Sequence, residues 1–141
     1  MSKFEVFEIS DRNPYLAGFR TWLDGFEPNL WERLEELESL PAETQLQVLV
    51  GSLELACLTQ HIGNITLGRF VLQRRLPREW VVRHISSAAE SILADLDQEW
   101  VFRRLAELYS TLDAELLRQL VTRGEEHPDP DVREAAREFR V

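Results

Sequence analysis

The side chains best suited to chemistry in this sequence are its single cysteine and its three histidines. Cys57 lies inside the apolar run LQVLVGSLELACL, where a thiol packs as a small apolar group and lacks the basic neighbours that favour a reactive thiolate. The histidines fall in three separate segments, at no spacing that would let two of them share a metal ion. They are His61, His84 and His127.

One segment near the C-terminus, HPDPD, could in principle offer three metal ligands, His127, Asp129 and Asp131. A turn leading into a helix explains it more simply, because Asp and Pro both favour turns and helix starts. The chain also lacks a glycine-rich phosphate loop and a metalloprotease helix motif. We therefore predict no catalytic residue, no metal and no cofactor.

Two charged groups are candidate binding residues. The acids Glu32, Glu35 and Glu36 lie about one turn apart in a predicted helix. A solvated surface explains them, but an acidic ridge would also speed association with a basic groove on a partner and make it more specific. The second group lies in GRFVLQRRLPREWVVRH, whose interleaved arginines and aromatic residues are typical of protein interfaces, although a helix C-terminus also favours such cations. It comprises Arg69, Arg74, Arg75 and Arg78.

A different interpretation places a small-molecule or substrate pocket between helices near HIGNITLGR. There Asn64 and Arg69 would supply the polar contacts. Helical bundles do build sites between facing helices. Convergent polar groups in a deep pocket would favour this alternative.

The charge balance favours a protein partner. The chain carries a net charge of −9, and residues 1–60 hold 4 basic and 11 acidic side chains. Acidic surfaces repel nucleic acid and membranes, so neither is an expected partner, and a basic protein is favoured. Nearly all basic residues are arginine, which we take as a sign of a bacterial genome rich in G and C.

Length and composition predict one domain over residues 1–141. A chain of 141 residues can bury a core without metals or disulfides. It contains no apolar run long enough for a membrane span, and its N-terminus, MSKFEVFEIS, does not resemble a secretory signal. Because Cys57 has no partner for an internal disulfide, a cytoplasmic location is expected.

Helical spacing of apolar residues dominates the chain and predicts an all-α fold. The run FEVFEI alone alternates like a strand, and residues 1–12 are expected to be extended. The predicted helix caps are Asn13, Asn64, Asp97 and Ser110 or Thr111, and Gly63, Gly124 and the prolines are expected to break helices. We expect about eight helices, at approximately 13–24, 28–40, 42–60, 64–76, 77–94, 97–109, 110–124 and 130–139. The third is apolar on most sides and should be the central helix.

The phrase EWVVRHI at residues 79–85 is nearly repeated as EWVFRRL at residues 99–105. In each copy the acid would lie in the first turn of a helix, and the tryptophan would lie on the core-facing side. We therefore expect Trp80 and Trp100 to be buried and equally costly to remove. The sequence leaves open whether Arg83, Arg103 and Arg133 are structural or functional.

The segment HPDPDVREAAREF resembles the helix start of a HEAT-like repeat, in which Asp and Pro close a turn and a Val-Arg pair opens a helix. LDQEWVFRRLAELY matches the same pattern loosely, and the region from Leu55 to Phe139 is similar to small bacterial all-helical proteins that are largely uncharacterised. The resemblance implies a short, irregular stack of antiparallel helical hairpins and no reaction.

Together these features predict a non-catalytic protein-binding module. Its small size, acidity and missing active site are similar in profile to immunity proteins, which neutralise a toxin by occlusion. A toxin or another basic protein is thus the expected partner. A ligand-binding or enzymatic bundle and a structural or scaffolding protein are the alternatives, and the oligomeric state stays open.

Overall fold

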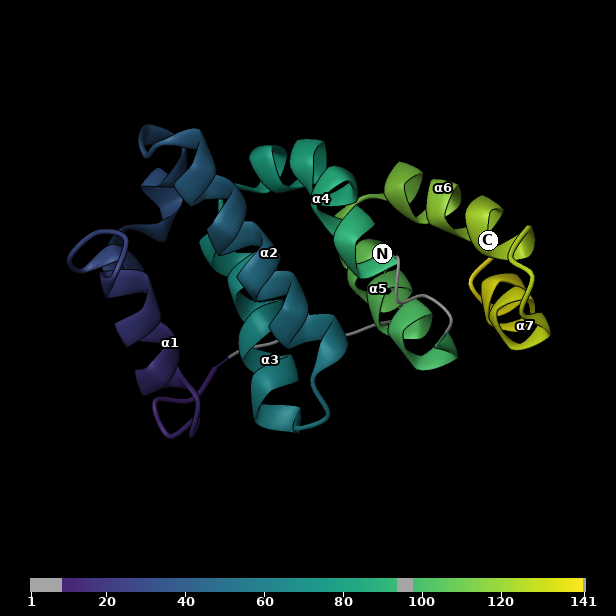
Figure 1. Ribbon diagram of the computed structural model, residues 1–141, viewed down its shortest axis with the longest axis horizontal. Helices are drawn as coiled ribbons and strands as arrows, with labels where there is room; N and C mark the ends of the chain where they lie inside the picture. Colours follow the sequence, from purple (N-terminus) through teal and green to yellow (C-terminus); the bar gives the residue numbers. More distant parts are fainter. Residues whose placement is uncertain (1–8, 94–97, 141) are drawn as a thin grey trace.

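The computed structural model of the protein describes residues 9–93 and 98–140. In these residues the chain forms seven α-helices, one 3-10 segment and one π-helical segment, with no strand (Figure 1). The predicted all-α class is therefore confirmed. The elements are α1 (Leu16–Asp24), η1 (Leu30–Ser39), α2 (Ala42–Leu58), α3 (Ile62–Phe70), η2 (Val71–Arg75), α4 (Arg78–Leu93), α5 (Glu99–Leu112), α6 (Ala114–Glu125) and α7 (Pro130–Glu138).

The helices follow one another along the long axis of the molecule, from α1 at one end to α6 and α7 at the other (Figure 1). The helix α2 packs against α3, α4, α5, η1 and η2, as its apolar composition predicted. Neighbours in sequence also pack together at the far end, where α6 contacts both α5 and α7. None of the helices within the described residues is both long enough and apolar enough to cross a membrane.

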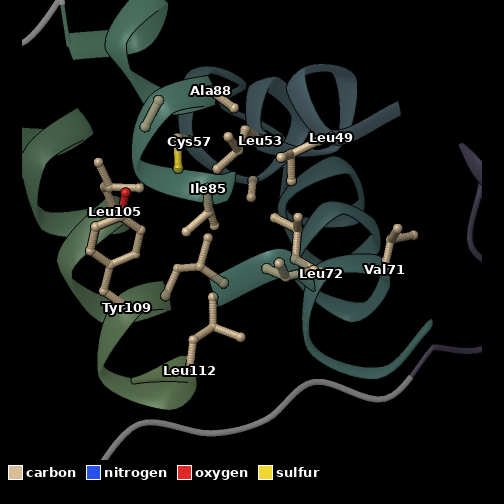
Figure 2. Packing of buried hydrophobic residues seen from close by; sticks show 14 of the residues in the cluster. Leu49, Leu53, Cys57, Val71, Leu72, Ile85, Ala88, Leu105, Tyr109 and Leu112 are labelled. Carbon is tan, nitrogen blue, oxygen red and sulfur yellow. The ribbon is translucent and has the colours of Figure 1, made fainter. Parts of the chain in front are cut away.

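Buried side chains form one cluster that extends from Leu16 to Phe139. Figure 2 shows part of it, with Leu53 and Cys57 of α2 among side chains of α4 and α5 such as Ile85 and Leu105. Each fully buried aliphatic side chain contributes about 1.5 to 3 kcal/mol to folding relative to its exposed state. The cluster therefore couples elements from both ends of the molecule.

The second element differs from the regular helix expected over residues 28–40. It is a 3-10 segment with non-helical backbone angles at Arg33 and Glu36. Its buried residues Trp31, Leu34 and Leu37 recur every third position. That period matches the three residues per turn of a 3-10 helix, whereas in an α-helix the three side chains would spread over about 120° of its surface. The helix expected at 28–40 is therefore present, as a 3-10 segment in place of an α-helix.

The predicted cap of the first helix is misplaced. The side chain of Asn13 accepts a hydrogen bond from the N–H of Tyr15 at 2.9 Å, which closes a turn ahead of α1. Its amide also donates to the carbonyl of Gly63 at 3.0 Å and so ties this turn to α3. The helix itself begins at Leu16.

Later helix boundaries also depart from the prediction. His61, and not Asn64, caps α3, because its Nδ1 accepts from the N–H of Gly63 at 2.9 Å. Gly63 therefore lies within α3 and does not break it. The helix α5 continues through Ser110 and Thr111 to Leu112, and Asp113 caps α6. The helix α6 passes through Gly124, while the predicted cap Asp97 and the strand-like segment before Ile9 lie outside the described residues.

A glycine brings α2 and α3 into close contact. A Cβ atom added at Gly68 would lie 2.6 Å from the backbone nitrogen of Ala56 and 2.7 Å from the carbonyl oxygen of Ser52. No side chain fits between the helices at this point. The helix α3 then continues into the π-helical segment η2, where the buried Gln73 donates to the hydroxyl of Thr111 on α5 at 3.0 Å.

Candidate functional site

The arginines of the predicted basic surface turn toward different neighbours. Arg69 on α3 is buried, with 5% of its surface exposed. Its Nη1 donates to Oε2 of Glu107 on α5 at 3.2 Å. Burial lowers the pKa of the Arg69 guanidinium, and the Glu107 carboxylate opposes that shift. Arg69 therefore joins two helices and presents little charge to solvent.

Arg75 connects η2 with η1. Its guanidinium lies over the ring of Trp31, 4.6 Å from the centroid, and donates a hydrogen bond to the Trp31 carbonyl. Its Nη2 also lies 3.6 Å from Oε2 of Glu35, so the structure brings together one residue from each predicted binding group. Arg74 is exposed. The guanidinium of Arg75 thus contacts a ring face, a carbonyl and a carboxylate of its own chain, and these contacts connect η2 with η1.

Arg78 binds the end of α5. Its Nη2 donates to the carbonyl oxygens of Thr111 and Leu112, both at 2.9 Å. These carbonyls have no partner within their own helix and lie at the negative end of its dipole. Three of the four predicted basic residues thus hold elements of the fold together.

The sequence left open whether Arg83, Arg103 and Arg133 are structural or functional, and the structure separates them into two kinds. Arg103 binds Glu99 of its own helix and Glu138 of α7. Arg133 donates to the two carbonyls of the preceding loop, those of residues 127 and 128. Both are therefore structural. Arg83 is different, because it lies on the exposed side of α4, 3.4 Å from a carboxylate oxygen of Glu38.

The acidic side chains of η1 form ion pairs with arginines of other elements. Because η1 has three residues per turn, Glu32, Glu35 and Glu38 form one row, and Glu36 lies on another side. Each acid of the row pairs with an arginine from a different element, Arg20 of α1, Arg75 of η2 or Arg83 of α4. These largely exposed pairs are worth about 0 to 1 kcal/mol each. Within the described residues, Glu36 takes part in no ion pair.

The residues of the alternative pocket do not converge. Asn64 and Arg69 are five positions apart on α3, which places them about 140° apart around the helix axis. Arg69 is directed toward Glu107, and Asn64 is half-buried on another side. This geometry gives no support to a ligand or substrate site built from these two residues.

The cysteine and the histidines occupy structural positions. Cys57 is fully buried among apolar side chains of α2, α4 and α5 (Figure 2). Burial raises the pKa of its thiol to about 12, so a thiolate is disfavoured. His61 and His127 each accept a backbone N–H through Nδ1, and His84 packs beside Trp80. Within the described residues, no three ligand-type side chains gather to hold a metal ion.

Two exposed apolar side chains, one on α1 and one on α2, were not predicted from the sequence. Leu46 of α2 is 51% exposed and Trp22 of α1 is 40% exposed. The indole of Trp22 covers Gly51, since a Cβ atom there would lie 2.5 Å from its Cη2 atom. The glycine within α2 is the sequence feature that leaves room for the ring of Trp22.

Comparison with known proteins adds no family to these observations. No family model matches the chain, and neither a curated protein nor a solved structure matches it.

Proposed function

We propose that this protein is a non-catalytic binding module that occludes or scaffolds a basic protein through the acidic surface of its N-terminal helices. The distribution of charge carries this proposal, since residues 1–60 hold 4 basic and 11 acidic side chains. In the helices α1, η1 and α2 of this region, four exposed acids take part in no ion pair, namely Asp24, Glu36, Glu43 and Glu54. Uncompensated carboxylates attract basic surfaces and repel nucleic acid.

The roles of the arginines support a surface of one dominant sign. Arg69, Arg75 and Arg78 are directed toward carboxylates and carbonyls of their own chain. The charges of Arg69 and Arg75 are therefore less accessible to a partner than those of the unpaired acids. The partner that fits this arrangement is a protein rich in lysine and arginine.

Inhibition by occlusion, in the manner of immunity proteins, is the most specific form of the proposal. It includes a bacterial, cytoplasmic protein with a HEAT-like helical scaffold and a toxin as its basic partner. The buried, reduced Cys57 is compatible with the cytoplasm. A scaffolding role without inhibition uses the same surface. An enzymatic role lacks support, because the polar residues of the alternative pocket diverge.

Affinity purification tests this proposal. The tagged protein is mixed with lysate of the cells that produce it, and retained proteins are identified by mass spectrometry. The control is a variant with the four unpaired acids neutralised, Asp24→Asn, Glu36→Gln, Glu43→Gln and Glu54→Gln. We expect one basic protein that the variant retains less and that high salt releases. If the retained proteins are the same for both forms, the proposal is wrong.

A growth assay separates the two forms of the proposal. The identified partner is expressed alone and together with this protein. Growth arrest that is relieved by co-expression supports inhibition. A harmless partner leaves scaffolding and excludes a toxin.

A further inference from the structure

The first turn of α3 depends on one imidazole. The N–H of Gly63 is among the first amides of this helix, which lack a carbonyl partner within it. The Nδ1 atom of His61 accepts this N–H at 2.9 Å, while the amides of Asn64 and Ile65 donate to the carbonyl oxygen of His61. A ring nitrogen that accepts a hydrogen bond carries no proton. The closed turn therefore requires a neutral imidazole with its proton on Nε2.

The same turn contacts the segment ahead of α1, residues 13–15, called here the Asn13 turn. The carbonyl oxygen of Gly63 accepts from the side-chain amide of Asn13 at 3.0 Å. The ring of Tyr15 meets the ring of His61 edge to face, with centroids 4.9 Å apart. A Cβ atom added at Gly63 would lie 2.9 Å from Cδ2 of Tyr15. Gly63 thus binds His61 through its N–H and the Asn13 turn through its carbonyl.

These contacts hold one end of α1. The helix packs chiefly against η1, and the ring of Trp22, near its other end, covers Gly51 of α2. Its residues Phe19 and Leu23 are buried. Loss of the contacts at Gly63 would therefore loosen the N-terminal end of α1 and leave the helix attached through its buried side chains.

Protonation of His61 is incompatible with the closed turn. Histidine changes its charge between about pH 5 and pH 8, and the imidazolium carries an N–H on both ring nitrogens. Such a ring cannot accept the N–H of Gly63, so two donors would face each other. The added charge would also lie at the positive end of the α3 dipole. Both effects oppose a proton on Nδ1 while the turn is closed.

The groups around the ring do not compensate the added charge. Tyr15 is the titratable side chain in contact with it, and phenols stay neutral in this pH range. From α5, Arg104 donates to the carbonyl of Thr59, two residues before His61, and so brings a further cation to this end of α2. No carboxylate of the described residues pairs with the imidazole.

We propose that His61 is a pH-sensitive latch between α3 and the Asn13 turn. Its protonation releases the N–H of Gly63, opens the first turn of α3 and loosens the contacts of Asn13 and Tyr15. The open turn leaves Nδ1 free to bind a proton, whereas the closed turn does not. The closed turn thus binds fewer protons, and its stability is present at neutral pH and lost on acidification.

The other two histidines do not control a helix start in this way. His127 also accepts a backbone N–H through Nδ1, that of Asp129 at 3.0 Å. The carboxylate of Asp129 itself caps α7, so the cap does not depend on the imidazole. His84 lies within α4 beside the ring of Trp80. His84 is therefore a suitable control position.

Amide hydrogen exchange followed by NMR at pH 7.5 and pH 5.0 tests the latch. Exchange rates are divided by the intrinsic rate at each pH, which gives a protection factor for the N–H of Gly63. The side-chain amide resonances of Asn13 report the contact with α1 in the same spectra. The ring resonances of His61 report its protonation. We expect the protection factor of Gly63 to fall roughly fivefold on acidification, the ratio that corresponds to one helix cap.

Matched variants assign the effect to the imidazole. His61→Asn keeps a side chain that caps helices well and does not titrate. We expect its Gly63 protection to be nearly independent of pH, and His84→Asn to behave as the wild-type protein does. His61→Ser supplies a second non-titrating cap should the asparagine variant be misfolded by circular dichroism. Between pH 7.5 and pH 5.0 the melting temperature of the wild-type protein should fall about 3 °C further than that of His61→Asn.

Three results would overturn the proposal. The first is unchanged protection of Gly63 while the His61 ring becomes protonated. The second is an equal fall in protection for the wild-type protein and His61→Asn, which would assign the pH dependence to other groups. The third is a fall at Gly63 with unchanged Asn13 resonances, which would leave a pH-dependent cap and remove the link to α1.

Discussion

Removal of Trp80 should be one of the most damaging single changes in this chain. The residue is 3% exposed, and its indole N–H donates to Oε1 of Gln45 at 3.0 Å. Gln45 in turn donates to the carbonyl of Leu40 at 2.8 Å, at the junction between η1 and α2. A buried tryptophan removes roughly 150 to 250 Å² from water, which corresponds to about 4 to 6 kcal/mol. Because alanine retains part of this burial, we expect Trp80→Ala to cost about 3 to 5 kcal/mol.

Trp100 occupies the matching place in the repeated phrase but a different environment. It is only partly buried, and its N–H bonds to the exposed Gln98 at 2.6 Å. Arg104 covers one side of its ring, with Cζ 4.6 Å from the centroid. We expect Trp100→Ala to cost about 1 to 2 kcal/mol, since much less area leaves water at this site. The expectation of equal burial is therefore corrected.

Urea unfolding followed by far-UV circular dichroism measures both costs without relying on tryptophan fluorescence. Trp80→Phe is the matched control, because it keeps a buried ring and loses the N–H group. It should cost about 1 to 2 kcal/mol. The reasoning is refuted if Trp100→Ala destabilises as much as Trp80→Ala. It is equally refuted if Trp80→Ala costs less than about 1 kcal/mol with an unchanged denaturant slope.

Three further changes have defined expectations. Burial raises the pKa of Cys57 to about 12. The folded thiol stays protonated where the unfolded thiol, with a pKa of about 8.5, ionises. Ionisation of the unfolded thiol should therefore lower the free energy of unfolding by about 1.5 to 2 kcal/mol between pH 7 and 10, and Cys57→Ala should remove this contribution, as urea titrations at each pH would show. Glu107→Gln should cost about 2 to 4 kcal/mol in the same assay, because it removes the carboxylate facing buried Arg69, and a loss under about 0.5 kcal/mol would contradict this. Gly68→Ala should lower the melting temperature by at least about 5 °C, because its methyl group would collide with the backbone of α2, whereas an unchanged value would exclude that contact.

The spacing of apolar residues predicted the helices well, because burial of one side of a helix places apolar residues at helical intervals along the sequence. Trp31, Leu34 and Leu37 of the expected helix at 28–40 lie in the core. Their spacing of three was already visible and indicated a 3-10 segment, but it is compatible with an α-helix over so few turns. Grouping Glu36 with Glu32 and Glu35 assumed the period of an α-helix. In the 3-10 segment Glu38, and not Glu36, lies in line with the other two acids.

Caps and arginine contacts were less predictable because they depend on neighbours distant in sequence. His61 caps α3 with an imidazole nitrogen, which is outside the usual set of capping side chains. The carbonyls bound by Arg78 lie 33 and 34 positions along the chain. Local sequence correctly indicated that arginine favours helix ends, but it could not indicate which helix end each arginine meets.

The exposed side of α2 was missed for a related reason. Leu46 and Val50 are as apolar as the core residues beside them, so composition alone assigns them inward. The packing of α3, α4 and α5 against α2 decides which of its apolar residues are buried, and it leaves Leu46 open.

The dissociation constant of the isolated partner, measured as a function of ionic strength, tests the central claim most directly. The wild-type protein is compared with the variant in which Asp24, Glu36, Glu43 and Glu54 are neutralised. Recognition of a basic protein by these acids predicts weakening with salt for the wild-type protein, together with an affinity at least about tenfold lower and a shallower salt dependence for the variant. Equal affinity and equal salt dependence for the two forms would contradict the claim.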